Sequence, residues 1–339
     1  MITIWSIIVS VLIGFITTYF LTPLSIDFLK SSGILGIDQQ KKDRPEIPTS
    51  GGISVIFGFL TAVSIFIGIR TFVFVSVENS LVLASLSSVL VIGLIGLIDD
   101  IHVKKAEEFV KKESQLSVGF KRWWVKPLFV IPAALPLMVV RAGQSSMMLP
   151  VLGSVDFGIL YPLILVPVGV ICVSNATNML AGQNGLEAGT GAIALLSIGV
   201  FSLLNNRIEA AALSLSMGFS LLAFLRYNFY PAKILPGDSL TYSYGAVIAA
   251  SAIIGNVQRF SAFVFIPWII EAFLKLRSRF KASSLGELRH DGTLEPKHDR
   301  IYSLTHLLMK FDGMTERKLV ICMYGIEAVI CLIAFIIFL

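Results

Sequence analysis

The sequence is poor in charged residues. Asp, Glu, Lys and Arg make up 14% of the 339 residues, whereas 55% are hydrophobic and the mean hydropathy is +0.82. Ordinary soluble domains are about 25% charged. A chain this apolar is not a soluble globular protein, so we predict an integral membrane protein.

Cysteine and repeated motifs are scarce as well. Cys172, Cys322 and Cys331 all fall inside apolar stretches, and no CxxC pair occurs. This pattern argues against a disulfide framework and a zinc site. The sequence also lacks an internal repeat, a heptad pattern and a low-complexity linker. We therefore predict a single membrane domain over residues 1–339.

Long apolar runs are abundant. Because runs of roughly 18 or more apolar residues predict membrane-spanning helices, we expect an all-α polytopic protein with about ten of them. The predicted helices cover residues 3–24, 51–70, 80–98, 123–140, 157–175, 187–204, 209–225, 239–257, 259–274 and 317–338. The first run has no basic stretch before it and no small-residue cleavage motif after it, which predicts an uncleaved helix.

Positive charge is distributed unevenly between the loops. The segments 25–50, 99–126, 226–238 and 273–318 contain all 27 Lys and Arg residues except Arg70, Arg141, Arg207 and Arg259. The positive-inside rule therefore predicts that these segments are cytoplasmic and that both termini are extracytoplasmic. This rule explains most of the net charge of +5, which otherwise favours anionic lipids or substrates over a specific nucleic acid.

One segment on the predicted outer side has the pattern of a β-hairpin. Residues 141–157 alternate apolar and polar side chains around Gly153-Ser154. Alternation on both sides of a glycine-containing turn is typical of two paired strands. We predict a small, structural β-hairpin at the membrane surface.

Asn and Gly residues gather between two apolar runs, in Asn175-Ala-Thr-Asn-Met-Leu-Ala-Gly-Gln-Asn-Gly-Leu-Glu-Ala-Gly189. Asn175, Asn178 and Asn184 offer amide oxygens to a metal ion or amide edges to a nucleobase, and Glu187 adds a carboxylate. Such oxygens suit a hard divalent cation and, through it, a phosphate. Asn and Gly are also common in ordinary turns, and Glu187 equally suits a first helical turn.

Carboxylates lie beside two other apolar runs. Asp99 and Asp100 follow the third run, so we predict that they end its helix. The helix dipole disfavours acids there and favours a compensating cation, either Mg²⁺ or a nearby lysine. Asp238 precedes the eighth run, where capping of that helix explains it as well as metal binding does.

Two basic stretches are candidates for phosphate binding. Lys42 and Arg44 lie in a proline-containing segment, and Arg277, Arg279 and Lys281 follow the ninth run. Arg in particular binds phosphate through two parallel hydrogen bonds. Contact with anionic lipid headgroups explains any one of these residues equally well.

Four motifs, in this order and spacing, resemble the polyprenyl-phosphate N-acetylhexosamine-1-phosphate transferase family. They are Arg44-Pro-Glu-Ile-Pro-Thr-Ser-Gly-Gly52, Asp99-Asp100, the segment 175–189 and Pro236-Gly-Asp-Ser-Leu-Thr-Tyr242. The similarity spans nearly the whole chain. Bacterial members usually carry an Asp-Gly-Leu-Asp-Gly type of sequence where this chain has Asn184-Gly-Leu-Glu-Ala-Gly189. The chain is therefore most similar to the UDP-GlcNAc–dolichyl-phosphate branch of eukaryotes and archaea.

The resemblance implies roles for these residues. Mg²⁺, with Mn²⁺ as an alternative, would be held by Asn178 and Asp238, and the uridine would lie near Asn184. Asp99, Asp100 and Lys126 would line the catalytic centre, although Lys126 aligns only if residues 103–121 contain an insertion. The remaining substrate-binding candidates are Lys42, Arg44, Asn175, Glu187, Arg277, Arg279 and Lys281. Two departures are Arg277-Ser-Arg-Phe-Lys281 in place of a His-rich or Arg-His-Arg motif, and Val103 in place of a third acid.

The implied reaction transfers GlcNAc-1-phosphate from UDP-GlcNAc to dolichyl or another polyprenyl phosphate, giving GlcNAc-diphosphodolichol and UMP. By resemblance, this is the first step of lipid-linked oligosaccharide assembly for protein N-glycosylation. The alternatives are a transporter of a nucleotide sugar or lipid, or a sister transferase that uses another UDP-hexosamine and undecaprenyl phosphate. The expected location is an archaeal plasma membrane, or the endoplasmic reticulum in a eukaryote, with a cytoplasmic active site. The family also implies a homodimer.

Overall fold

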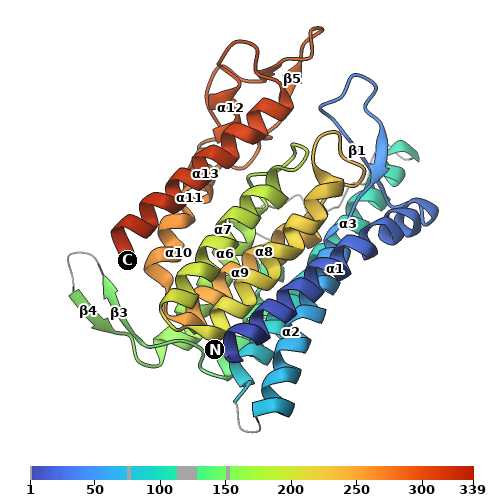
Figure 1. Ribbon diagram of the computed structural model, residues 1–339. Coiled ribbons are helices and arrows are strands. Elements are labelled where there is room, and N and C mark those ends of the chain that lie inside the picture. The colour runs from blue at the N-terminus through green and yellow to red at the C-terminus, as the bar shows by residue number, and fades with distance from the viewer. Residues whose placement is uncertain (1, 75–77, 113–127, 150–152) are drawn as a thin grey trace.

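The computed structural model describes residues 2–74, 78–112, 128–149 and 153–339 of the chain, and most of them are helical, as predicted (Figure 1). The helices are α1 (Ile2–Ser31), α2 (Gly52–Phe74), α3 (Ser80–Lys112), α5 (Ile131–Val139), the π-helical turn η1 (Tyr161–Leu165), α6 (Val166–Thr177), α7 (Leu186–Leu204), α8 (Ile208–Asn228), α9 (Gly237–Gly255), α10 (Gln258–Val264), α11 (Ile266–Arg277), α12 (Leu304–Leu308) and α13 (Glu316–Phe338). The strands pair as antiparallel hairpins: β1 (Leu35–Ile37) with β2 (Glu46–Pro48), β3 (Ser146–Leu149) with β4 (Gly153–Asp156), and β5 (Gly286–Leu288) with β6 (Leu294–Pro296).

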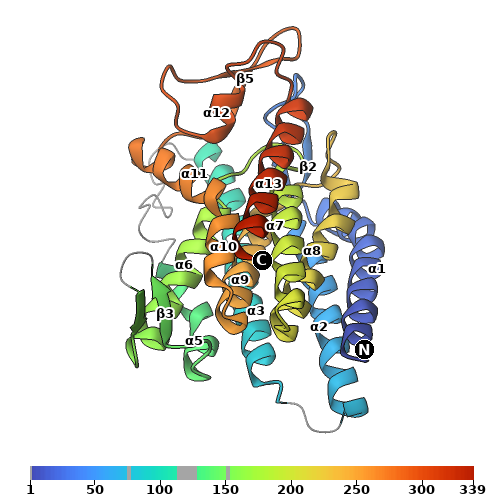
Figure 2. The ribbon, with the colours of Figure 1, turned by 60° about the vertical axis from the view of Figure 1, so that its left-hand side comes forward.

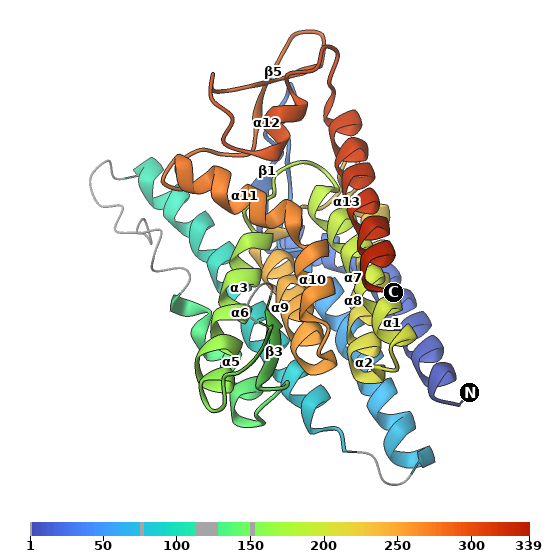
Figure 3. The same cartoon turned by 90° about the vertical axis from the view of Figure 1, so that its left-hand side faces the viewer.

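The hairpins lie at opposite ends of the helical bundle. β1–β2 and β5–β6 lie at one end, which we call the site end, and β3–β4 lies at the other, the hairpin end (Figure 1, Figure 2). At the site end, the segment with β5, β6 and α12 connects α11 to α13 (Figure 3). The hairpin predicted within residues 141–157 is confirmed, since Met147 pairs with Val155 across β3 and β4.

Six of the described helices are long and apolar enough to cross a membrane: α1, α2, α3, α7, α8 and α13. The protein is therefore a polytopic membrane protein. Three other predicted runs are less regular. Within residues 123–140 the described helix is only α5, residues 157–175 form η1 and α6, and residues 259–274 are divided into α10 and α11. That division has a physical cause, because Pro267 has no N–H to continue the helical hydrogen bonds.

The eighth predicted run is α9, which lies among the other helices. It packs against α2, α3, α6, α7 and α8, and nearly all of its residues are buried. These neighbours shield its hydroxyl groups from lipid, which explains how a helix containing Ser239, Thr241, Ser243 and Ser251 is stable within the bundle.

α3 is longer than predicted. It continues to Lys112, so Asp99 and Asp100 lie inside a helix, and the prediction that they end it is wrong. The apolar run stops near Ile98, but the sequence after it contains Lys, Glu and Ala, which favour helix. The negative end of a helix dipole therefore does not act on the aspartate pair.

α3 and α9 approach closely at Gly96. A methyl group added at Gly96 would lie 2.6 Å from Cα of Ser239 and 2.7 Å from the carbonyl oxygen of Asp238. Small residues permit this spacing between membrane helices, where association depends on close packing. Gly96 thus sets the position of the first turn of α9 relative to α3.

We expect Gly96→Ala to destabilise the protein. Overpacking of this kind costs about 1–3 kcal/mol, which exceeds the gain of about 0.5–1 kcal/mol from replacing a helical glycine by alanine. The free energy of unfolding in a detergent titration should therefore fall. The matched control is Gly68→Ala in α2, where an added methyl group meets no atom within 4 Å. Equal destabilisation of both variants would contradict the packing argument.

Candidate active site

A cavity of 260 Å³ lies at the site end. Its walls come from β1 and the residues after it, α3, the end of α6, the glycine-rich turn before α7, and the first turn of α9. The predicted site residues that line it are Asp100, Asn178, Asn184, Glu187 and Asp238. The fold therefore brings together amides and carboxylates from three separate segments of the sequence.

Asp100 joins α3 to the first turn of α9. Its carboxylate accepts hydrogen bonds from the backbone N–H groups of Asp238 at 2.7 Å and Ser239 at 3.3 Å. A carboxylate suits the positive end of a helix dipole, so Asp100 caps α9 from a neighbouring helix. Gly237, with φ of 73°, leaves room for that carboxylate. The predicted alternative, that Asp238 caps its own helix, is wrong because the N-cap residue is Pro236.

Asn178 meets the same turn of α9. Its Oδ1 accepts a hydrogen bond from the Thr241 hydroxyl at 3.1 Å, and the Thr241 hydroxyl also lies 3.2 Å from the carbonyl oxygen of Asp238. The hydroxyl of Thr177 donates to the carbonyl oxygen of Thr241 at 2.9 Å. The end of α6 is thereby fixed against α9, next to Asp238.

The glycine-rich turn is closed by Glu187. Gly182 and Gly185 have φ values of 111° and 88°, a left-handed region that favours glycine. Oε1 of Glu187 accepts a hydrogen bond from the N–H of Gly182 at 2.8 Å. Oε2 is buried and has no hydrogen-bond partner among the described residues. Glu187 is thus a first-turn residue of α7 that also presents an acceptor at the cavity.

Asn184 is held by acidic residues that sequence analysis missed. Its Nδ2 donates to Asp38 at 2.9 Å, and its backbone N–H donates to Glu316 at 2.8 Å. Lys41 forms ion pairs with both carboxylates. Glu316 comes directly before the last apolar run, as Asp238 comes directly before the eighth. This shared position in the sequence could have identified Glu316 as a candidate site residue. Within the described structure, Oδ1 of Asn184 is buried without a partner and remains an acceptor.

The segment after α11 is fastened to the cavity through Ser284, which sequence analysis also missed. Its carbonyl oxygen accepts a hydrogen bond from Gln183 at 3.0 Å, and its hydroxyl donates to the carbonyl oxygen of Met179 at 3.0 Å. Nζ of Lys275 donates to the same hydroxyl at 2.7 Å. These bonds place Leu285 in the cavity wall.

A buried polar cluster supports this segment. Glu271 and Lys275 form an ion pair with a separation of 3.4 Å, and Glu271 also accepts a hydrogen bond from the N–H of Leu304 at 2.8 Å. His306 is fully buried beside them. Burial, together with the Lys275 charge, lowers the pKa of His306 below its usual value, so its ring is neutral at pH 7. The cluster holds the segment in position.

Other residues predicted for the catalytic centre and the Asn-rich segment are either absent from the described lining of the cavity or lie outside the described residues. Asp99 is not among the described residues that line it. Asn175, two residues before the end of α6, donates its side-chain amide to the carbonyl oxygen of Ile171 in its own helix at 2.8 Å. Lys126 lies outside the described residues.

The predicted basic residues lie around the site end. Lys42 and Arg44 are exposed in the connection between β1 and β2, and Lys42 lines a separate cavity of 420 Å³. Arg277, Arg279 and Lys281 are exposed at and just beyond the end of α11. None of these side chains is among the described residues that line the 260 Å³ cavity.

The cavity residues fit a hard divalent cation. In the described part of the chain, no three His, Cys, Asp or Glu side chains form a ready-made metal cluster. Mg²⁺ commonly uses only one or two protein carboxylates and completes its shell with water and substrate phosphate. Asp238 in the first turn of α9 and Asn178 at the end of α6 offer oxygens. Buried oxygens of Asn184 and Glu187, which have no partner in the part of the chain that the structure describes, add further acceptors. This oxygen-only set suits Mg²⁺ or Mn²⁺.

An apolar groove of 680 Å³ lies beside the polar cavity. It is lined by η1, α6, α9, α10 and α11 and extends from Met147 in β3 to Phe280 after α11. Ala176 lines the groove two residues before Asn178, which lines the cavity. The groove therefore reaches the end of α6 at which the polar cavity begins.

The chain is similar in sequence to known proteins. The model of glycosyl transferase family 4 matches residues 82–256. A Saccharolobus solfataricus protein, provisionally named UDP-N-acetylglucosamine–dolichyl-phosphate N-acetylglucosaminephosphotransferase, is 37% identical over 97% of this chain and 96% of its own length. The Dictyostelium discoideum protein of that name is 27% identical over 91% of this chain and 81% of its own.

A bacterial relative is also similar over most of its length. The phospho-N-acetylmuramoyl-pentapeptide-transferase of Halalkalibacterium halodurans is 29% identical over 74% of this chain and 75% of its own length. The family model covers half of the chain, and the matched residues contain Asp99, Asp100, the glycine-rich turn and Asp238. The chain therefore belongs to glycosyl transferase family 4.

Proposed function

We propose that this protein transfers GlcNAc-1-phosphate from UDP-GlcNAc to dolichyl or another polyprenyl phosphate and releases UMP. The observation that carries the proposal is the cavity that gathers Asp100, Asn178, Asn184, Glu187 and Asp238 beside an apolar groove. The names of the archaeal and Dictyostelium relatives, one of them 37% identical, specify this reaction.

The reaction forms one phosphorus–oxygen bond and breaks another. An oxygen of the polyprenyl phosphate attacks the β-phosphorus of UDP-GlcNAc, and the bond to the bridging oxygen breaks, so UMP leaves with both electrons. A phosphate monoester has its second pKa near 6 and is largely dianionic at pH 7, so the nucleophile needs no strong base. The protein then has to align the two phosphates and stabilise the charge that develops on the leaving group.

The cavity residues supply these functions. Asp238 and Asn178 would hold Mg²⁺, which when bound neutralises charge on the pyrophosphate. Asp100 is a positioning residue, because it fixes the α9 turn that carries Asp238. The free acceptor oxygen of Asn184 suits the N–H of a uracil ring. Glu187 holds the glycine-rich turn whose backbone surrounds the nucleotide.

The apolar groove would hold the first isoprene units of the acceptor. Its lining is almost entirely hydrophobic, and it extends to Ala176 near the end of α6, two residues before Asn178 in the lining of the polar cavity. Arg277, Arg279 and Lys281 flank the groove at Phe280. Their positive charges are placed to attract the acceptor phosphate, which is a different role from the predicted clamp on the pyrophosphate.

The location of the cavity favours an enzyme over a transporter. Transporters bind substrate near the middle of the bilayer, between broken helices, whereas this cavity lies at one end of the bundle. The site end carries most of the Lys and Arg residues, which supports a cytoplasmic active site and extracytoplasmic termini. The archaeal relative favours an archaeal plasma membrane and a role in N-glycosylation.

The direct test is UMP release by detergent-purified protein given UDP-GlcNAc, dolichyl phosphate and Mg²⁺, with detection of the GlcNAc-labelled lipid. We expect Asp238→Asn to lower kcat by at least ~100-fold, since it replaces a charged carboxylate ligand of the proposed metal ion by a neutral amide. Removal of divalent cations with EDTA should abolish turnover, and Mg²⁺ or Mn²⁺ should restore it. A wild-type protein that is equally active without any divalent cation would overturn the metal assignment.

Control experiments distinguish a specific effect at the candidate site from a general effect on the protein, and test other substrates. Asp156→Asn removes an exposed carboxylate at the hairpin end and should leave kcat unchanged. UDP-GalNAc and UDP-MurNAc-pentapeptide with undecaprenyl phosphate test the sister reactions. A folded protein that uses one of these pairs in preference to UDP-GlcNAc and dolichyl phosphate would replace the proposed substrates but keep the reaction class.

The variant Gly169→Leu tests whether the apolar groove binds the lipid acceptor. Gly169 in α6 lines the groove, and an added Cβ meets no atom within 4 Å, so the leucine side chain fits but occupies the lipid path. We expect KM for a long polyprenyl phosphate to rise about tenfold, equivalent to 1.4 kcal/mol, with KM for UDP-GlcNAc unchanged. Gly68→Leu in α2, which is also open at Cβ, is the control. Unchanged acceptor KM in Gly169→Leu would exclude this groove.

A further inference from the structure

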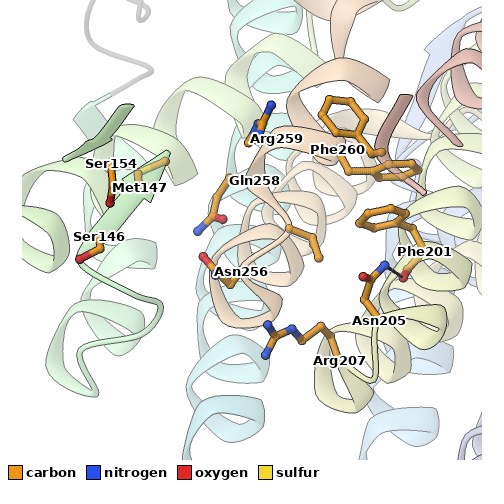
Figure 4. A pocket seen from close by; sticks show the side chains of 12 residues that line it. Ser146, Met147, Ser154, Phe201, Asn205, Arg207, Asn256, Gln258, Arg259 and Phe260 are labelled. Carbon is orange, nitrogen blue, oxygen red and sulfur yellow. Dashed lines mark hydrogen bonds between the residues drawn. The ribbon is translucent and has the colours of Figure 1, made fainter. Parts of the chain in front are cut away.

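A second polar cavity, of 380 Å³, lies at the hairpin end, far from the candidate active site (Figure 4). Its walls come from the β3–β4 hairpin, the connection from α7 to α8, the connection from α9 to α10, and the end of α13. Figure 4 shows Arg207 and Asn205 across the cavity from Ser146 and Ser154, with Arg259 between the two walls. Nothing in the proposed transfer reaction uses these residues.

The cavity concentrates positive charge. Arg207 and Arg259 are two of only four basic residues outside the basic segments of the sequence, and both line this cavity. Of the other two, Arg70 is paired with Glu209 at 2.8 Å. None of the described residues that line the cavity is Asp or Glu. The site therefore favours an anion, and two arginines favour a phosphate in particular.

The walls of the cavity are fixed by contacts between distant segments. Asn256 donates to Gln144 at 2.8 Å, and Gln258 donates to the hydroxyl of Tyr161 at 3.0 Å. These bonds tie the connection between α9 and α10 to the segments around the hairpin. The guanidinium of Arg259 lies 5.5 Å from the ring centre of Phe338. A cation over an aromatic ring is held in place at little cost in solvation.

The polar cavity adjoins the apolar groove. Met147 and Gln258 line both, so the groove and the cavity are neighbours at the hairpin end. Phe201 and Phe260 stack with ring centres 3.9 Å apart and form a further apolar wall. A free phosphate would leave these apolar surfaces uncovered. A ligand with a phosphate and a hydrocarbon chain matches both parts.

We propose that this cavity binds the phosphate headgroup of a membrane lipid in the leaflet that borders the hairpin end. Arg207 and Arg259 contact the phosphate, and one hydrocarbon chain enters the adjoining end of the apolar groove. The binding site does not depend on the proposed transferase reaction, because it is defined by residues at the opposite end of the bundle.

The test is native mass spectrometry of delipidated full-length protein with phosphatidic acid. We expect a one-to-one complex that Arg207→Gln/Arg259→Gln weakens by about tenfold or more, because two charge-assisted contacts are lost. Diacylglycerol with the same chains should not bind. The control is Arg141→Gln, which removes an exposed arginine not found among the described residues that line the cavity, and it should leave the affinity unchanged.

Three results would overturn the proposal. Equal weakening in Arg141→Gln would mean that lipids respond to surface charge alone. Unchanged binding in the double variant, with an unchanged unfolding temperature, would place the lipid elsewhere. Inorganic phosphate that binds as tightly as phosphatidic acid would identify a site for a free anion and not for a lipid.

Discussion

The hydrogen bonds from the first turn of α9 to the carboxylate of Asp100 are the interaction on which the site depends. Hydrogen bonds to a charged group contribute about 1.5–3 kcal/mol, more than neutral ones. Here they lock a long membrane helix, α3, to the start of the buried helix α9. Thr241, one turn along α9, then positions Asn178 at the end of α6. Without that cap, neither Asp238 nor Asn178 would have a fixed place at the cavity.

The polar cavity and the apolar groove at α6 and α9 provide separate sites for the two proposed substrates, a soluble donor and a lipid acceptor. Polar groups are costly within the bilayer, and here they gather at one end of the bundle, where a nucleotide can enter from water. The apolar groove follows the same helices and needs no polar group. Ala176 lines the groove and Asn178 lines the polar cavity, so both extend to the last residues of α6.

The sequence predicted the class of fold and five of the residues that line the candidate site. Apolar runs reveal helices directly, and the Asn-rich turn, Asp100 and Asp238 stand beside such runs. The break at Phe265 and the continuation of α3 were missed because hydropathy does not report backbone hydrogen bonding or helix propensity. Asp38, Lys41 and Glu316 were missed because they pair with residues 132 to 275 positions away in the chain, which spacing in one sequence cannot reveal.

The most direct measurement is an experimental structure of the full-length protein with UDP-GlcNAc and Mg²⁺ at a temperature that slows turnover. We expect the pyrophosphate and the metal ion to lie between Asp238 and Asn178, the uracil to lie at Asn184, and the carboxylate of Asp100 to remain hydrogen-bonded to α9. A pyrophosphate bound outside the 260 Å³ cavity, or a metal ion that contacts neither Asp238 nor Asn178, would contradict it.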